Sequence, residues 1–302
     1  MRLSCLWACL LLAGAGVAAA DELEDAFDNL KKAETDKDAA QVKRLAAETH
    51  ALALKALSAP APANSDEKQA WTKQVAYLKE VDLHTEYSLY AVAIQSPAPV
   101  LIDLISTLEQ QNPKSKYLDL GYGSYLGAVG QAGSHAKATA IAEKAIGNFP
   151  ENESLLSVLM DAAYSSKQTD RAATYATRLT AALSKHAKPE GVPAADWERY
   201  RSRELGRGYW IAGTIHSSQQ KWAAANKELR AALPLIKADD AMAGLAFFDL
   251  GLANYQLGKL TINKAQVLEA ASYFEQAAKY PAYATEAWRN AGVAKRDAGG
   301  MR

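Results

Sequence analysis

The sequence has little of what several protein classes depend on. Only Cys5 and Cys9 are cysteines among its 302 residues. If the first twenty residues are removed, the rest can form no disulfide, cysteine nucleophile or thiolate metal site. Lys plus Arg and Asp plus Glu each number 34, so no net charge attracts nucleic acid or an anionic membrane. The 18 glycines and 10 prolines are too few for a fibrous or disordered chain.

The first twenty residues are expected to form a signal peptide. Arg2 is followed by a short apolar run at residues 6–12 and by the small residues Ala18, Ala19 and Ala20. We expect cleavage between Ala20 and Asp21, which would give a periplasmic or secreted protein with no stable membrane span. A lipid-modified Cys9 is the less favoured alternative, because the apolar core follows that cysteine instead of preceding it.

Helical periodicity dominates the remaining sequence. No stretch alternates apolar and polar residues in the way that strands do, and apolar residues recur at helical spacing. Before residue 113 the expected helices are 22–33, 39–57, 67–90 and 100–111, with breaks at the proline pairs 60/62 and 97/99 and at Pro113. The sequence therefore predicts an all-α fold.

A longer pattern recurs from residue 117 onward. An aromatic or large apolar residue is followed by a small residue, usually glycine, and then by spaced alanines. Ala138 and Ala172 are 34 residues apart, and the later intervals, to Ala225 and Ala270, are 53 and 45. We assign the surplus to residues 185–193 and 260–264. The residues expected to pack the helices together are Tyr117, Gly121, Ala138, Ala172, Tyr209, Gly213, Ala225, Phe247, Gly251 and Ala270.

This pattern resembles the tetratricopeptide repeat, a helix–turn–helix unit of about 34 residues. The resemblance implies a right-handed α-solenoid. We expect a signal peptide at 1–20, degenerate helix pairs at 21–113 and a repeat array at 114–302. The array would contain an inserted linker near 184–196 and a terminal helix from about 284. One departure is Met160, which stands where the repeat usually has glycine, and another is a set of five extra residues near 127–135.

The resemblance also implies a concave groove lined by the first helix of each pair. None of the positions transferred to it is Lys or Arg, so we expect no clamp for a peptide's terminal carboxylate. Aromatic side chains there would suit an apolar or amphipathic peptide or partner helix. An alternative is that the tyrosines only pack within their own repeats. The expected groove residues are Tyr122, Tyr125, Asp161, Tyr164, Trp210, Thr214, Phe248 and Tyr255.

Catalytic and metal-binding patterns were not found. The five histidines are scattered without His-x-x-x-His spacing, and no Gly-x-Ser-x-Gly motif occurs. We therefore expect a non-catalytic protein–protein interaction scaffold of the cell envelope, with no cofactor, no metal and a protein or peptide partner. The first alternative is a self-assembling or structural component of an envelope complex, with an exposed seam around Trp288. A remote alternative is a hydrolase-type enzyme that would use Asp161 with a second acid.

Overall fold

The computed structural model describes residues 15–189 and 191–301, which form 13 α-helices and no strand within those ranges. The all-α prediction is therefore confirmed. The chain divides into two compact units, residues 1–138 and 139–302, and the division falls within helix α6 (His135–Ala145). Residues 1–14 of the predicted signal peptide lie outside the described residues, and residues 15–20 begin helix α1.

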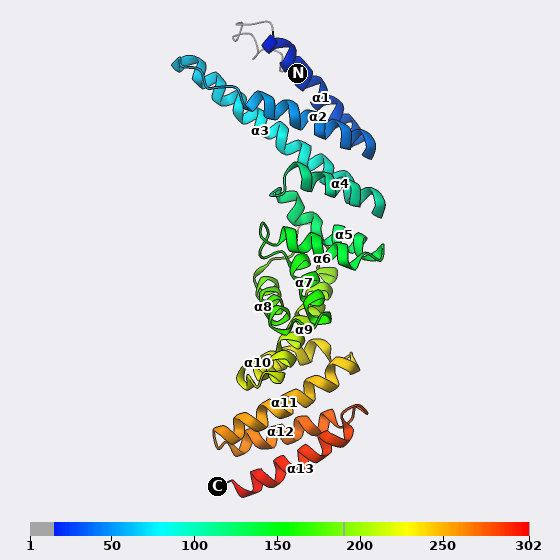
Figure 1. The fold of residues 1–302 in the computed structure, drawn as a ribbon, viewed down its shortest axis with the longest axis vertical. Helices are drawn as coiled ribbons and strands as arrows, with labels where there is room; N and C mark the ends of the chain where they lie inside the picture. Colours follow the sequence, from blue (N-terminus) through cyan, green and yellow to red (C-terminus); the bar gives the residue numbers. More distant parts are fainter. Residues whose placement is uncertain (1–14, 190, 302) are drawn as a thin grey trace. The chain divides into compact units, whose positions relative to one another are not determined.

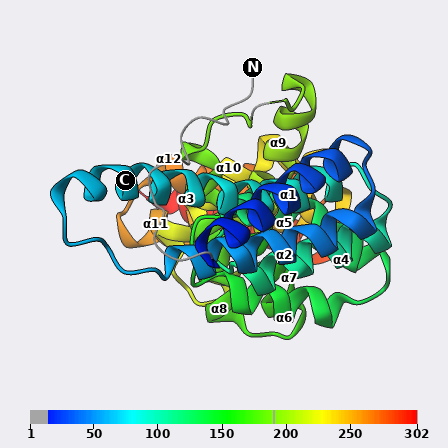
Figure 2. The ribbon, with the colours of Figure 1, turned by 90° about the horizontal axis from the view of Figure 1, so that it is seen from above.

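The first unit contains five complete helices. Helices α1, α2 and α3 pack against one another, α4 packs on α2 and α3, and α5 packs on α3 and α4 (Figures 1 and 2). Residues 127–131 belong to α5, so the expected extra residues lengthen a helix and not a connection. The bounds are α1 (Ala15–Thr35), α2 (Ala39–Leu57), α3 (Ser65–Ala93), α4 (Ala98–Gln111) and α5 (Lys116–Gln131).

The second unit continues from α6 through seven more helices. Each helix from α7 onward contacts the next one, and α9 also contacts both α7 and α11 (Figure 1). Helices α7, α9 and α11 therefore form one continuous row within this unit. The bounds are α7 (Glu153–Ser165), α8 (Thr169–Lys185), α9 (Ala194–Ser218), α10 (Trp222–Ile236), α11 (Asp240–Leu260), α12 (Lys264–Ala277) and α13 (Ala284–Gly300).

Five helix pairs are joined by the same three-residue turn. In each turn the residue two positions after the first helix has a positive φ, and the next N–H bonds to the carbonyl five residues earlier at 2.8–3.2 Å. This is the Schellman arrangement, which satisfies carbonyls at a helix end and reverses the chain sharply. The pairs are α1–α2, α5–α6, α7–α8, α9–α10 and α11–α12. Their positive-φ residues are Lys37, Gly133, Lys167, Gln220 and Ile262.

Small residues allow the paired helices of the second unit to approach closely. A Cβ on Gly213 would lie 2.6 Å from the side chain of Leu229, and one on Gly251 would lie 2.5 Å from the ring of Phe274. Ala225 and Ala270 are fully buried on the facing helices. Close approach increases the dispersion contacts between the helices, and it makes these sites sensitive to added volume.

The surplus residues of the longer repeats lie mainly within helices. Helix α9 has 25 residues and α11 has 21, whereas α7 has 13. The turn between α11 and α12 is short, so the expected surplus at 260–264 is wrong. Trp197, which is 8% exposed, packs the N-terminal extension of α9 onto the core shared with α8. Pro234 lies inside α10, which continues to Ile236.

Candidate functional site

A surface hollow in the second unit brings together side chains of α7, α9 and α11. Its volume is about 350 Å³. Three predicted groove residues, Asp161, Tyr164 and Trp210, lie together in it. Ser165 also stands at a groove position that the repeat implies, whereas Arg207, Ile211 and Met242 were not predicted. The α7–α9 hollow, as we call it, is lined by Asp161, Tyr164, Ser165, Arg207, Trp210, Ile211 and Met242.

Trp210 and Tyr164 form an aromatic wall of this hollow. Their ring centroids are 5.9 Å apart with an interplanar angle of 64°, which is the favourable edge-to-face arrangement. The Trp210 indole N–H donates to the carbonyl oxygen of Met242 at 2.9 Å. Trp210 also packs against the core clusters on both sides of α9. The indole is therefore held in place, while Tyr164 is 39% exposed and accessible.

Arg207 supplies a positive charge that the sequence analysis missed. Its guanidinium bonds to the Asp161 carboxylate and also donates to Glu204 at 3.2 Å. Burial raises the pKa of Asp161, although the hydrogen bond and charge of Arg207 oppose that shift. Arg207 lies one helical turn before Trp210, outside the transferred groove positions. Its charge is compensated, so the lining of the hollow carries no net charge.

Glu204 is a buried carboxylate that also bonds to Arg207 and so fixes the position of this ion pair. The residue is 2% exposed, and its carboxylate accepts hydrogen bonds from Ser157 at 2.7 Å and from Arg203 at 2.9 Å in addition to Arg207. A buried carboxylate needs such donors because the loss of hydration is costly. Ser157 belongs to α7 and Glu204 to α9. The network therefore fixes the two helices that form the hollow.

Three other predicted groove residues are buried. Tyr122 and Tyr125 are 1% and 2% exposed, and the Tyr122 hydroxyl donates to Glu109 at 2.9 Å. Burial, followed by the charge of Glu109, raises the pKa of Tyr125 to about 12. Thr214 is 8% exposed and donates to the Ile211 carbonyl of its own helix. These side chains offer almost no surface to a partner, which corrects the expectation for them.

Phe248 and Tyr255 have internal contacts toward the C-terminal end. Phe248 stacks on Tyr283 at 5.7 Å between centroids and also meets a core ring edge-on. The Tyr255 hydroxyl donates to Asp297 at 2.6 Å, and Lys259 bonds to the same carboxylate oxygen. These bonds lower the pKa of Asp297. Both aromatic side chains are only partly buried, but neither lines the α7–α9 hollow.

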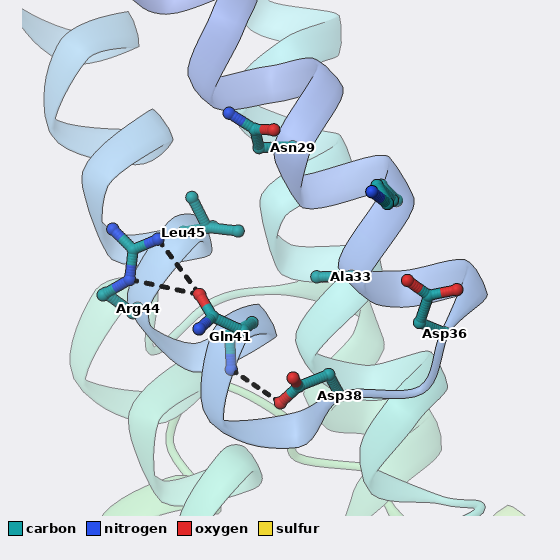
Figure 3. A pocket seen from close by; sticks show the side chains of 8 residues that line it. Asn29, Ala33, Asp36, Asp38, Gln41, Arg44 and Leu45 are labelled. Carbon is teal, nitrogen blue, oxygen red and sulfur yellow. Dashed lines mark hydrogen bonds between the residues drawn. The ribbon is translucent and has the colours of Figure 1, made fainter.

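A second hollow lies between α1 and α2 in the first unit (Figure 3). Its volume is about 310 Å³. Asp38 accepts from the backbone N–H of Gln41 and caps α2, and Arg44 donates to the side chain of Gln41. Lys32 and Asp36 complete a mixed lining of both charges. The polar groups that bond here stabilise the turn, and no aromatic side chain is present to anchor a ligand.

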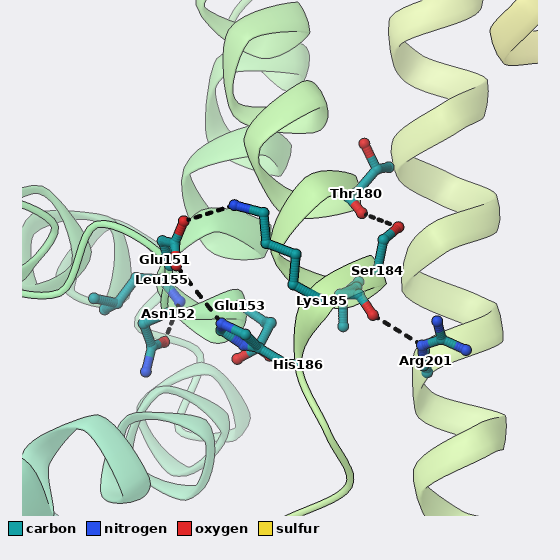
Figure 4. A network of polar contacts seen from close by, with 10 residues as sticks. Glu151, Asn152, Glu153, Leu155, Thr180, Ser184, Lys185, His186 and Arg201 are labelled. Carbon is teal, nitrogen blue, oxygen red and sulfur yellow. Dashed lines mark hydrogen bonds and ion pairs between the residues drawn. The ribbon is translucent and has the colours of Figure 1, made fainter.

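A network of polar contacts surrounds the connection between α8 and α9 (Figure 4). Lys185 bonds to Glu151 at 3.3 Å, and His186 bonds to Glu153. Arg201 of α9 donates to the Leu183 carbonyl at 2.8 Å, near the C-terminal end of α8. These contacts bond the C-terminal end of α8 to residues 151 and 153, at and just before the start of α7, and hold α9 beside α8.

Within 15–189 and 191–301, no group of three or more His, Cys, Asp and Glu side chains is placed to hold a metal ion. No helix of that part of the chain is long and apolar enough to cross a membrane.

No protein-family model matches the sequence. The search of curated proteins also gives no match.

Proposed function

We propose that this protein is an exported, non-catalytic scaffold with tetratricopeptide-like repeats that binds a peptide or partner helix in the α7–α9 hollow. The proposal places the protein in the cell envelope after removal of residues 1–20 and treats the helix pairs as a right-handed array. Its partner is an apolar or amphipathic segment of another protein.

The repeated Schellman turn supports the repeat assignment independently of the sequence pattern. Gly133 and Lys167 occupy the same position of successive turns and are 34 residues apart. The intervals to Gln220 and Ile262 are 53 and 42 residues, with much of the excess in the longer first helices. Glycine at the close helix contacts is also what the repeat requires.

The observation that carries the binding proposal is the aromatic wall over a charge-neutral lining. Trp210 is held by Met242 and by core packing, so little side-chain entropy is lost when a ligand contacts it. Met242 and Ile211 add apolar surface. Arg207 is already bonded to carboxylates, so it has less capacity to capture a peptide's terminal carboxylate. A hollow of about 350 Å³ fits one or two apolar side chains of an amphipathic segment.

Site-specific crosslinking tests this proposal. A photoreactive residue is placed at Ser165, which lines the hollow, and separately at Ser272, an exposed residue of α12. After crosslinking in the native envelope, the captured peptide is sequenced, synthesised and titrated against the purified protein. Crosslinks that form at Ser165 but not at Ser272 support the hollow as the binding site. Equal crosslinks at both positions contradict that assignment.

A matched pair of tyrosine variants then measures how much the aromatic wall contributes to the affinity for the peptide. Tyr164→Ala removes an exposed ring of the hollow, and Tyr77→Ala removes an equally exposed ring of the first unit, 39% against 38%. We expect Tyr164→Ala to weaken binding of the synthetic peptide by roughly tenfold or more, as for a central aromatic contact. Tyr77→Ala should leave the affinity unchanged. Equal affinities for the two variants would remove the hollow as the binding site.

The two alternatives from the sequence receive less support. Trp288 of α13 is 60% exposed, but the exposed residues on its own face of the helix, Thr285 and Lys295, are polar. A face of this kind does not provide the continuous apolar seam that self-assembly through α13 would need. For a hydrolase, Asp161 is bridged to Glu204 by Arg207. That arrangement favours ion pairing over the proton sharing that paired catalytic acids need.

A further inference from the structure

The turn between α11 and α12 exposes two large aliphatic side chains. Leu260 is 80% exposed and Ile262 is 73% exposed. They stand on either side of Thr261, where the chain reverses at one end of this helix pair (Figure 1). Residues 260–262 are called the α11–α12 tip below. Leu268, within the first two turns of α12, is exposed as well. Neighbouring apolar side chains that stay in water are a feature of interaction sites.

The other four turns of the same geometry provide an internal comparison. In each of them, the last residue of the first helix and the positive-φ residue two positions later are exposed. The last residues of those first helices are Thr35, Gln131, Ser165 and Ser218. The positive-φ residues are Lys37, Gly133, Lys167 and Gln220. Among the five turns, both positions are aliphatic only between α11 and α12, so the geometry of the turn does not require aliphatic residues there.

The backbone of Ile262 gives a second reason to look for a role of the tip. Its φ is 50°, in the left-handed region that a β-branched residue strongly disfavours. The exposed side chain makes little contact with the core, so packing does not offset this strain. A strained residue that the fold does not need is a starting point for a hypothesis of function.

Lysines flank the tip on both sides. Lys259 precedes it, Lys264 follows it, and no Asp or Glu occurs between residues 250 and 268. Lys259 bonds to Asp297 at 2.9 Å. Lys264 donates to the carbonyl oxygen of Met301 at 3.4 Å, and no ion pair to Lys264 occurs among the described residues. The formal charge of the whole chain is zero, so the positive charge beside the tip is a local feature.

The composition of the tip suits a lipid surface better than a protein partner. The cores of protein interfaces favour aromatic residues, Met and Arg, they are poor in Lys, and Leu is seldom a hot spot. Aliphatic side chains instead enter the boundary between headgroups and acyl chains, and lysines beside them extend their ammonium groups to anionic headgroups. A tight turn projects its side chains outward, so it offers no concave surface to hold a peptide.

We propose that the α11–α12 tip is a peripheral docking site for an anionic lipid surface. Leu260 and Ile262 enter the headgroup region, while Lys264 and the partly compensated Lys259 contact lipid phosphates. Two aliphatic side chains and so few charges give a weak and reversible attachment. Docking by the tip holds the second unit at the lipid surface, and it does not depend on the α7–α9 hollow being a binding site.

Vesicle binding of the purified full chain tests the tip. The protein is mixed with phosphatidylcholine vesicles and with vesicles that also contain phosphatidylglycerol, and the bound fraction is measured by co-sedimentation. We expect binding to the anionic vesicles that weakens at high salt, and clearly weaker binding to phosphatidylcholine alone. All variants keep the same N-terminal segment, so differences between them report on the substituted residues and not on residues 1–20.

Two kinds of variant separate the aliphatic part from the charged part. Leu260→Ser combined with Ile262→Gln copies the residues of the α9–α10 turn, so the fold is kept, and binding to anionic vesicles should weaken roughly tenfold or more. Leu120→Gln is its control, because it removes a leucine that is 60% exposed in the first unit. Lys264→Gln should weaken binding to anionic vesicles roughly fivefold. Its control is Lys73→Gln, at an exposed position of α3, and neither control should change binding.

The proposal is overturned if the protein does not bind anionic vesicles, or if the Leu260→Ser, Ile262→Gln variant binds them equally well. A photoreactive residue at position 262 gives a second measurement in the native envelope. We expect it to crosslink to phospholipid, and crosslinks to a protein instead would assign the tip to a protein partner and overturn lipid docking. Peptide capture at Ser165 should not change in these variants, so the two proposals can fail separately.

Discussion

Ile262 is strained by the turn between α11 and α12. It has a φ of 50°. A left-handed backbone costs an L-residue roughly 1–2 kcal/mol, and a β-branched residue is a strong outlier there. Ile262→Gly removes this strain, while the greater freedom of glycine in the unfolded chain takes back roughly 0.5–1 kcal/mol. The side chain is 73% exposed, so little buried area is lost. We expect a net stabilisation of about 0.5–1 kcal/mol.

Thermal unfolding followed by circular dichroism measures this effect. For a domain of this size each kcal/mol shifts the Tm by roughly 2–4 °C, so Ile262→Gly should raise it by about 1–4 °C. Ile262→Ala is the matched control, because it also removes the exposed side chain but keeps most of the left-handed penalty. If Ile262→Gly is no more stable than Ile262→Ala, the turn is not strained and the reasoning is wrong. Gly133→Ile, the reverse change in another turn, should destabilise its own unit.

Two further predictions concern packing and the buried carboxylate. Gly251→Ala should destabilise the protein by roughly 1–3 kcal/mol in urea titrations, because its new Cβ meets the buried ring of Phe274. Gly127→Ala, at an exposed position of α5 with open space around it, should instead stabilise by roughly 0.5–1 kcal/mol. Glu204→Ala should cost roughly 3 kcal/mol, because it breaks a buried ionic network, and Asp161→Ala should cost clearly less. Equal effects within either pair would contradict the assigned environments.

Helix boundaries could be predicted where proline or a capping residue interrupts the period. Proline 60 and 62 lie in the loop before α3, and α4 begins directly after Pro97. The repeated turn could not be predicted in this way. Four of its five positive-φ positions carry Lys, Gln or Ile, whose preferences point away from a left-handed backbone. The conformation there is imposed by the close packing of two helices and not by the residue itself.

The groove was predictable only in part, because periodicity says which residues share a helix face and not what covers that face. The same register that placed Tyr164 and Trp210 in the hollow also selected Tyr122, Tyr125 and Thr214, which are buried. Each register position is defined by its distance from an opening aromatic residue. A side chain at that distance is accessible only if the adjacent helices leave the face open.

Arg207 could have been assigned to the groove from helical spacing alone, if the spacing had been followed backward from Trp210. Glu204, Arg207 and Trp210 follow one another at intervals of three residues, so they share one face of a helix. The expected repeat began at Tyr209, which left Glu204 and Arg207 outside the groove. Helix α9 begins at Ala194, and its extension carries both residues to α7, where Asp161 and Ser157 meet them. The polar part of the hollow therefore follows from the length of α9, which the repeat pattern alone does not determine.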